Sequence, residues 1–463
     1  MKYCSTFSVK NFKPSSFRFS FLFIFIILII VSCSFYKPYI INNYHLNVEP
    51  ELRRPGFWIA QLDKPDKLIM GKKDIEAFNS KIIRKGLVKR FNSETLNNIK
   101  SADIEREIIS MYSYLHSKKL YYKDGSKVKD NFYKRIYKNL DIINIKENCN
   151  FGFVIKFSDQ RLIPTKEKLF DDPIYHYFDR NQNNGLDIGE PIIIAHKSYD
   201  GKWFYALSKY SSGWVESNNV VKADYSDINL LDRLRFIVIT AAKADLYDDP
   251  NLTHYRATTR MGNRYILMKV FNNYYEILIP QKDKKGYIYY KKFYINKNDA
   301  TIGYLPYTQR KILLQAFKML NTPYGWGDMA QEQDCSKFLQ QIFLTVGITL
   351  PRNSYGQAKS GINIYREDVN SVVLGEIVKN RLKPGITVIQ IPGHIMLYVG
   401  DYKNEQYVIH DLFGTNIMKN NKKYYLIVNQ VTVTPLNLGK DTRDGSLYDR
   451  IKHISLIEEE SFE

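Results

Sequence analysis

Apolar residues in the first third of the chain recur every three or four positions, which is the spacing of one helix face. The clearest case is a set of four such residues: Ile104, Ile108, Met111 and Leu115. Many charged residues stand between them, as is typical of a helix with one solvent-exposed side. The pattern predicts that residues 51–160 form a mostly helical amino-terminal region.

From about residue 161 the pattern changes to short apolar runs separated by polar turns, which is typical of strands. The turn Asp200-Gly201 lies between two such runs and predicts a hairpin. The same pattern is repeated further along the chain. We therefore expect two small β-domains, at residues 161–225 and 226–306.

A helical pattern returns at Cys335, where the following apolar residues keep helical spacing as far as Val346. Gly347 then provides a stop signal. A thiol in the first turn of a helix feels the partial positive charge of the helix N-terminus, which favours the reactive thiolate. Cys335 is therefore a candidate nucleophile, and the alternative is a small buried cysteine without a chemical role.

Two histidines follow in strand-like contexts. His394 opens an apolar run that ends at Gly400, and His410 ends the next such run after a polar turn. Adjacent antiparallel strands would bring the two imidazoles together. One would then act as general base toward the thiol while the other orients it. A lone histidine at a strand end is more often structural, but a cysteine at a helix start followed by two strand histidines favours the catalytic interpretation.

Several motifs occur together in this part of the chain. They are Pro-Tyr-Gly-Trp-Gly at 323–327, Asp-Cys-Ser at 334–336, Leu-Pro-Arg-Asn-Ser at 350–354 with Gln357, and Gly-His-Ile-Met-Leu-Tyr-Val-Gly at 393–400. Between about residues 308 and 430 the chain thus resembles the NlpC-type cell-wall peptidases. These are papain-like cysteine hydrolases that act on the stem peptides of bacterial peptidoglycan.

The resemblance implies roles for individual residues. Cys335 corresponds to the nucleophile, His394 to the base and His410 to the orienting third residue. The backbone N–H of Cys335 is the expected oxyanion donor. The positions expected to line the substrate cleft are Tyr324, Trp326, Asp334, Ser336 and Asn353.

Two positions depart from the family pattern. Lys337 stands where the family usually has glycine. Asn353 stands where relatives that recognise a free L-Ala amine carry aspartate. A neutral amide pairs less well with an ammonium group, so strict selection of free stem peptides is not implied.

The resemblance also implies an overall organisation of the α+β class. A papain-like catalytic domain at 307–463 would follow two small SH3-like β-barrels, and residues 51–160 resemble the clasp of larger lipoprotein members.

The first 33 residues have the pattern of an export signal. Basic residues precede the apolar run Phe21–Val31, and Ile30-Val31-Ser32-Cys33 resembles a bacterial lipobox. We expect Cys33 to carry lipid and residues 34–50 to form a tether; an uncleaved membrane anchor is the alternative. Either way the body would lie in the cell envelope, facing the periplasm or the exterior.

The formal charge of +19 suits anionic partners such as lipid headgroups or the wall. A nucleic-acid partner is not expected, because no binding motif for one is visible. If the region before residue 34 is a signal, Cys149 and Cys335 remain, and we expect both as free thiols. Residues 179–190 resemble a calcium loop, but the glycine falls at position 7 instead of 6, so we expect a turn there. No metal-binding motif and no cofactor are indicated.

The sequence therefore predicts a monomeric, lipid-anchored cysteine endopeptidase of peptidoglycan stem peptides. By resemblance the bond cleaved is the one between γ-D-glutamate and a diamino acid. Two alternatives stay open: a thiol amidase that cuts the muramoyl–L-Ala bond, and a catalytically inert wall-binding lipoprotein.

Overall fold

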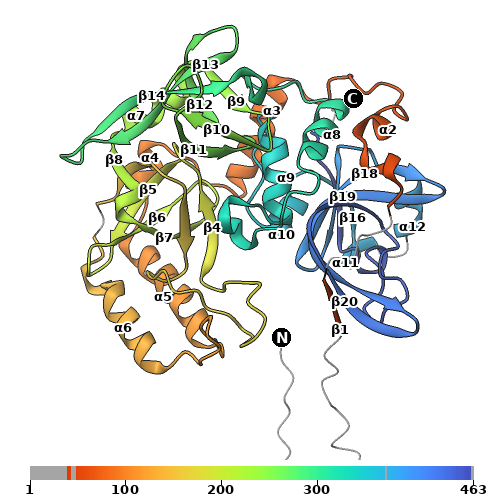
Figure 1. Ribbon diagram of the computed structural model, residues 1–463, viewed down its shortest axis with the longest axis horizontal. Helices are drawn as coiled ribbons and strands as arrows, with labels where there is room; N and C mark the ends of the chain where they lie inside the picture. The colour runs from red at the N-terminus through yellow and green to blue at the C-terminus, as the bar shows by residue number, and fades with distance from the viewer. Residues whose placement is uncertain (1–38, 43–47, 147, 371–372, 460–463) are drawn as a thin grey trace, which may run out of the picture.

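The computed structural model describes residues 39–42, 48–146, 148–370 and 373–459. Three seven-stranded sheets and a set of helices make up this part of the chain, which confirms the predicted mixture of helix and sheet (Figure 1). The expected leader, with Cys33, lies outside the described residues. Within the described ranges, no helix combines the length and the apolar character needed to cross a membrane.

The amino-terminal region is helical, as its apolar spacing predicts. Its elements are η1 (Pro50–Arg53), α2 (Pro55–Ile59), α3 (Lys72–Arg84), α4 (Ser93–Asn97), α5 (Ser101–His116), α6 (Asp130–Leu140) and η2 (Ile142–Asn144). Ile104, Ile108 and Leu115 of α5 are buried, and they pack in one core with Trp203 and Trp214 of the first sheet. Helices α5 and α6 therefore cover that sheet, at the lower left of Figure 1.

Helices α2 and α3 contact the carboxyl-terminal part of the chain instead. Trp58 of α2 and Phe78 of α3 belong to the same core as Phe338 of the helix that follows Cys335. A Cβ at Gly400 would lie 2.8 Å from the Trp58 ring. Glycine is thus required where the indole packs on the backbone.

The first two sheets have the same strand order. The first contains β2 (Asn150–Val154), β3 (Ser158–Arg161), β4 (Gln182–Leu186), β5 (Pro191–Lys197), β6 (Trp203–Leu207), β7 (Ser212–Glu216) and β8 (Val220–Ala223), with η3 (Ser217–Asn219) before β8. After α7 (Tyr225–Arg233), the second contains β9 (Phe236–Ile239), β10 (Lys243–Tyr247), β11 (Tyr255–Arg260), β12 (Arg264–Val270), β13 (Tyr274–Lys282), β14 (Ile288–Asn296) and β15 (Ala300–Ile302), with η4 (Lys297–Asp299) before β15.

The spatial orders are β4-β3-β7-β6-β5-β2-β8 and β11-β10-β14-β13-β12-β9-β15. Numbered within each sheet, both read 3-2-6-5-4-1-7, so one topology occurs twice. Neither set is the closed barrel that we predicted. In the described residues the first and last strands of each order share no ladder, so both sheets are open.

The third sheet has the order β1-β20-β19-β18-β17-β21-β16. Its strands are β1 (Tyr39–Asn42), β16 (Ile362–Arg366), β17 (Thr387–Ile391), β18 (His394–Tyr402), β19 (Glu405–Lys419), β20 (Lys422–Pro435) and β21 (His453–Leu456). The helices of this part are α8 (Gln309–Lys318), η5 (Trp326–Gln331), α9 (Cys335–Leu344), α10 (Ser354–Ala358), α11 (Glu367–Asn370), α12 (Leu374–Asn380) and η7 (Tyr448–Arg450). Apolar residues of α8 and α9 pack on β18, β19 and β20.

Two strands lie in segments where the sequence predicted other structure. The first sheet begins at Asn150, inside the range 51–160 that the helical pattern suggested for the amino-terminal region. Strand β1 lies within the expected tether 34–50 and pairs in parallel with β20.

Candidate active site

Cys335 is the first residue of α9, in the position that its helical spacing predicts. The preceding residue, Asp334, caps the helix: its Oδ1 accepts hydrogen bonds from the N–H groups of Ser336 at 3.2 Å and Lys337 at 3.0 Å. Within the described residues the N–H of Cys335 has no acceptor. A free donor therefore remains beside the thiol at the helix N-terminus.

The two candidate histidines meet, as the predicted pairing of their strands requires. β18 and β19 are antiparallel neighbours, and Nε2 of His394 lies 2.7 Å from Nδ1 of His410. Nε2 of His410 lies 3.0 Å from Oγ1 of Thr434 on β20. Three neighbouring strands thus form one hydrogen-bonded line, His394–His410–Thr434.

The thiol lies at one end of this line. The backbone N–H of Ile395, which follows His394, is hydrogen-bonded to the sulfur of Cys335. Because Nε2 of His394 is occupied by His410, Nδ1 is the ring nitrogen left for other contacts. If Nδ1 of His394 is to act as a base, the proton of that ring must be on Nε2, from which it is donated to Nδ1 of His410. His410 then carries its own proton on Nε2 and donates it to Oγ1 of Thr434.

Burial determines the charge of both groups at rest. Burial, and then the negative charge of Asp334, raises the pKa of the Cys335 thiol well above its ordinary value. Burial, and then the positive charge of Arg450, lowers the pKa of His394 to about 4. The expected lowering of the thiol pKa by the helix N-terminus is therefore outweighed. Both the thiol and the imidazole are therefore neutral at rest.

Several residues expected to line the cleft have partners within the protein. The carboxylate of Asp334 receives two hydrogen bonds from Arg352, at 2.9 and 2.7 Å, besides those of the helix cap. The Ser336 hydroxyl donates to Asp334 and accepts from Arg352. Asn353 caps α10 by accepting from the N–H of Gly356 at 2.7 Å.

Tyr324 and Trp326 are half-buried and belong to a cluster of aromatic side chains. Its members include Tyr177, Phe178, Phe413 and these two residues. Phe178 lies 5.0 Å from Trp326 and 4.5 Å from Phe413 between ring centroids. Residues 177 and 178 lie in the β3–β4 connection of the first sheet. The aromatic wall beside the thiol is therefore built from two parts of the chain.

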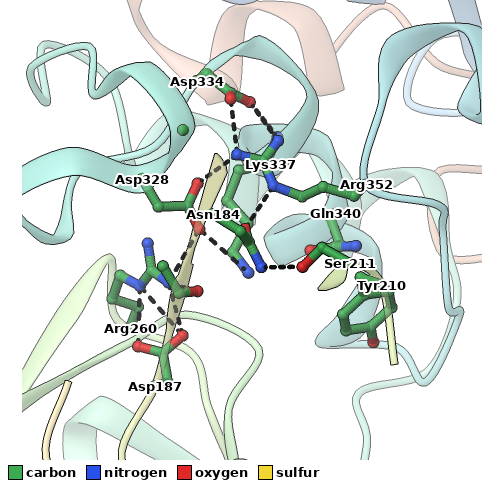
Figure 2. A network of polar contacts seen from close by, with 12 residues as sticks. Asn184, Asp187, Tyr210, Ser211, Arg260, Asp328, Asp334, Lys337, Gln340 and Arg352 are labelled. Atoms are coloured by element: carbon green, nitrogen blue, oxygen red, sulfur yellow. Dashed lines mark hydrogen bonds and ion pairs between the residues drawn. The ribbon is translucent and has the colours of Figure 1, made fainter. Parts of the chain in front are cut away.

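A buried polar network extends from Asp334, the cap of α9, and was not anticipated from the sequence (Figure 2). Arg352 also binds Oδ1 of Asp328 at 2.8 Å, and Arg260 of the second sheet binds Oδ2 of the same residue at 3.2 Å. Arg260 in turn pairs with Asp187 from the first sheet at 2.7 Å. Lys337 approaches Asp328 at 3.5 Å. The cap of α9 is thus connected to both small sheets.

Two further groups near the thiol were missed. Asp411, the residue after His410, is fully buried, and its Oδ2 accepts a hydrogen bond from Nε2 of Gln333 at 2.9 Å. Burial raises the pKa of Asp411 well above its ordinary value. Neither residue has a periodic signal in the sequence, because each is placed by the packing of β19 against the loop before α9.

No group of three metal-ligating side chains is found in the part of the chain that the structure describes. The loop at 179–190 serves other contacts: Asp179 pairs with Arg161 at 2.7 Å, and residues 182–186 form β4. Cys149 and Cys335 are both free thiols.

Two segments of the chain match known protein families. Residues 168–216 match the family model described as "SH3 domain (SH3b1 type)", and residues 321–433 match that of the NlpC/P60 family. A γ-D-glutamyl-L-lysine dipeptidyl-peptidase from Bacillus cereus (strain ATCC 10987 / NRS 248) is 27% identical over 172 residues, which are 36% of this chain and 47% of that protein. This chain therefore aligns with less than half the length of that relative.

Among solved structures, an NlpC/P60 endopeptidase from Photobacterium damselae subsp. piscicida superposes with a TM-score of 0.70 at 22% identity, over 87% of this chain and 97% of that one. An NlpC/P60 family protein from Bacillus cereus ATCC 10987 gives a TM-score of 0.46 at 16% identity, over 66% and 98%. The first of these shows a shared fold across most of the chain. Residues 321–433 of this chain are an NlpC/P60 domain, and a domain of the SH3b1 type precedes it.

Proposed function

We propose that this chain is a cysteine endopeptidase of peptidoglycan stem peptides. The observation that carries the proposal is the arrangement of the Cys335 thiol at the start of α9, next to the line His394–His410–Thr434. A nucleophile, a base and an oriented partner of that base are the parts that covalent amide hydrolysis requires.

The resting charges indicate how the reaction begins. The raised pKa of Cys335 and the lowered pKa of His394 favour the neutral pair, so Nδ1 of His394 takes the thiol proton as the sulfur attacks the amide carbonyl. The negative charge that develops on the carbonyl oxygen is stabilised by the N–H of Cys335. His394 then gives its proton to the leaving amine, and a thioester remains.

Water completes the cycle. His394, neutral again, removes a proton from water as it attacks the thioester, and the proton is returned to the sulfur as the acid leaves. His410 keeps His394 in the required tautomer throughout, because Nδ1 of His410 accepts a hydrogen bond from the N–H at Nε2 of His394.

The bond that we propose is the one between γ-D-glutamate and a diamino acid. The resemblance of the motifs supports this choice, and so does the name of the Bacillus cereus relative. The aromatic cluster beside the thiol supports a cleft shaped by the SH3b1-type domain as well as by the catalytic domain. The second sheet repeats the topology of the first, and we propose it as a second SH3-like domain.

The remaining parts of the proposal concern location and organisation. We propose export to the cell envelope with lipid attached at Cys33, which rests on the sequence pattern of the first 33 residues. We also propose a monomer, with domains at 51–160, 161–225, 226–306 and 307–463.

The test uses residues 34–463 with muropeptides of defined structure, and the products are identified by mass spectrometry. Cleavage at the γ-D-glutamyl bond is expected, with no product from Cys335→Ala. Cys149→Ala is the matched control, because it removes the other free thiol and should retain full activity. Cleavage at the muramoyl–L-Ala bond would overturn the choice of bond, and bound but intact muropeptide would overturn the enzyme.

A further inference from the structure

A cavity of about 910 Å³ lies where α3, both small sheets and α9 come together. Lys337 and Leu344 of α9 line it, whereas Cys335 does not. Residues two positions apart on a helix point in nearly opposite directions, so the cavity and the thiol lie on different sides of α9. The volume falls within the range of small-molecule sites.

One wall of the cavity carries two cationic side chains, Lys209 and Arg264. Among the described residues, no hydrogen bond or ion pair holds the ammonium group of Lys209, although the side chain is half-buried. Burial, and then the charge of Arg264, lowers its pKa. Arg264 pairs with Asp232 at 2.6 Å and also lines the cavity. Asp232 and Glu190 act on the pKa of Lys209 in the opposite direction, but among the described residues neither lies within ion-pair distance of its ammonium group, so an anion can approach it.

On another wall, the carboxyl group of Glu190 can accept a further hydrogen bond. Oε2 of Glu190 accepts the N–H of Asp187 at 3.0 Å, while Oε1 has no hydrogen-bond partner within the described ranges. Among the other charged side chains, Asp187 pairs with Arg260 and Lys337 with Asp328, while Lys209 interacts with Glu190 only beyond ion-pair distance. Burial raises the pKa of Glu190 to about 7. A donor such as an ammonium group would satisfy the free oxygen.

The space between these walls is bordered by aromatic and aliphatic groups, including Tyr210, Tyr304 and Val346. A ligand with a compact organic body and opposite charges at its two ends matches this distribution. We infer that the cavity binds a short zwitterionic peptide, with its carboxylate at Lys209 and Arg264 and its ammonium at Glu190. The site goes beyond the proposed function, since none of its residues takes part in the chemistry at Cys335.

Calorimetry on the full body, residues 34–463, tests the inference with L-alanyl-L-alanine as the probe. Cys335→Ala is used throughout, so that no turnover interferes. The dipeptide is expected to bind with a stoichiometry of one. Its N-acetyl and carboxamide derivatives, each lacking one charge, should bind at least tenfold more weakly.

Variants distinguish this cavity from the catalytic cleft. Lys209→Met should weaken binding at least tenfold. Glu190→Gln, which still accepts the N–H of Asp187, should do the same. Lys222→Met removes an exposed lysine from the same sheet and should change nothing. Hydrogen exchange provides a second readout that does not depend on these variants folding, because the dipeptide should protect the segments around 209 and 264. Binding that persists unchanged in both variants would overturn the inference. Absence of both binding and protection at about 10 mM dipeptide, a concentration above the millimolar Kd of a weak ligand, would overturn it as well.

Discussion

Replacing Arg260 by methionine removes the cation that joins the two small sheets to the catalytic domain. Its side chain is 1% exposed, and it binds Asp187 through Nε at 2.9 Å and through Nη2 at 2.7 Å. Nη2 also reaches Asp328 at 3.2 Å and the carbonyl of Gly185 at 3.3 Å. The substitution therefore leaves one buried carboxylate without its cation, and a second with fewer partners.

The expected cost is large, because breaking one side of a buried ion pair typically lowers the free energy of unfolding by about 3–5 kcal/mol. Asp328 keeps Arg352 and Lys337, so most of the loss should come from Asp187. The double variant Arg260→Met with Asp187→Asn removes the stranded charge. It should be more stable than Arg260→Met alone, by on the order of 1–2 kcal/mol, the usual coupling of contacting residues.

Urea unfolding followed by tryptophan fluorescence and circular dichroism measures these differences. Arg256→Met is the matched control, since Arg256 is an exposed arginine on the same strand and should change stability by less than about 0.5 kcal/mol. A loss below about 1 kcal/mol for Arg260→Met, well under the value for a buried pair, would refute the reasoning, as would a double variant no more stable than the single one.

Two further predictions concern the proposed reaction. Because burial lowers the pKa of His394 to about 4, the imidazole is unprotonated above that pH and can act as the base. In a pH profile, kcat/KM should therefore fall only as the pH drops through about 4. A fall of kcat/KM around the ordinary histidine pKa, near 6.5, would contradict the assignment of His394 as the base. Thr434→Val removes the acceptor for Nε2 of His410, and a lost hydrogen bond of about 1 kcal/mol should lower kcat several-fold to tenfold with KM unchanged. Thr432→Val, whose hydroxyl lies 3.4 Å from the backbone carbonyl of Val433, is its control, and equal losses in both variants would argue against a specific role for Thr434.

The parts of the site that were predictable depend on local patterns. Helical spacing placed Cys335 at a helix start, and apolar runs placed His394 and His410 on strands that proved to be neighbours. The predicted end of the second strand, at His410, was wrong. β19 continues past His410 to Lys419, because a bulge after Leu412 allows pairing with β20 to resume in a stretch where the apolar pattern is weaker.

The parts that were not predictable depend on packing between distant segments. Phe178 and Arg260 lie far from Cys335 in the sequence, and no periodicity relates them to it. The protonation state of the Cys335 thiol was predicted wrongly for the same reason. A helix N-terminus can be recognised in the sequence, but the burial that raises the pKa of Cys335 exists only once the chain has folded.

The order of strands in the third sheet limits how the protein can be shortened. β21 lies between β17 and β16, yet it comes after residue 433, where the NlpC/P60 match ends. A fragment limited to the matched residues 321–433 would lack β21, so β16 would lose its ladder and β17 would expose an apolar edge, which invites aggregation. It would also lose Trp58, leaving the backbone at Gly400 uncovered. An excised catalytic domain must therefore keep residues through Leu456 and be supplied with the amino-terminal segment that carries the indole.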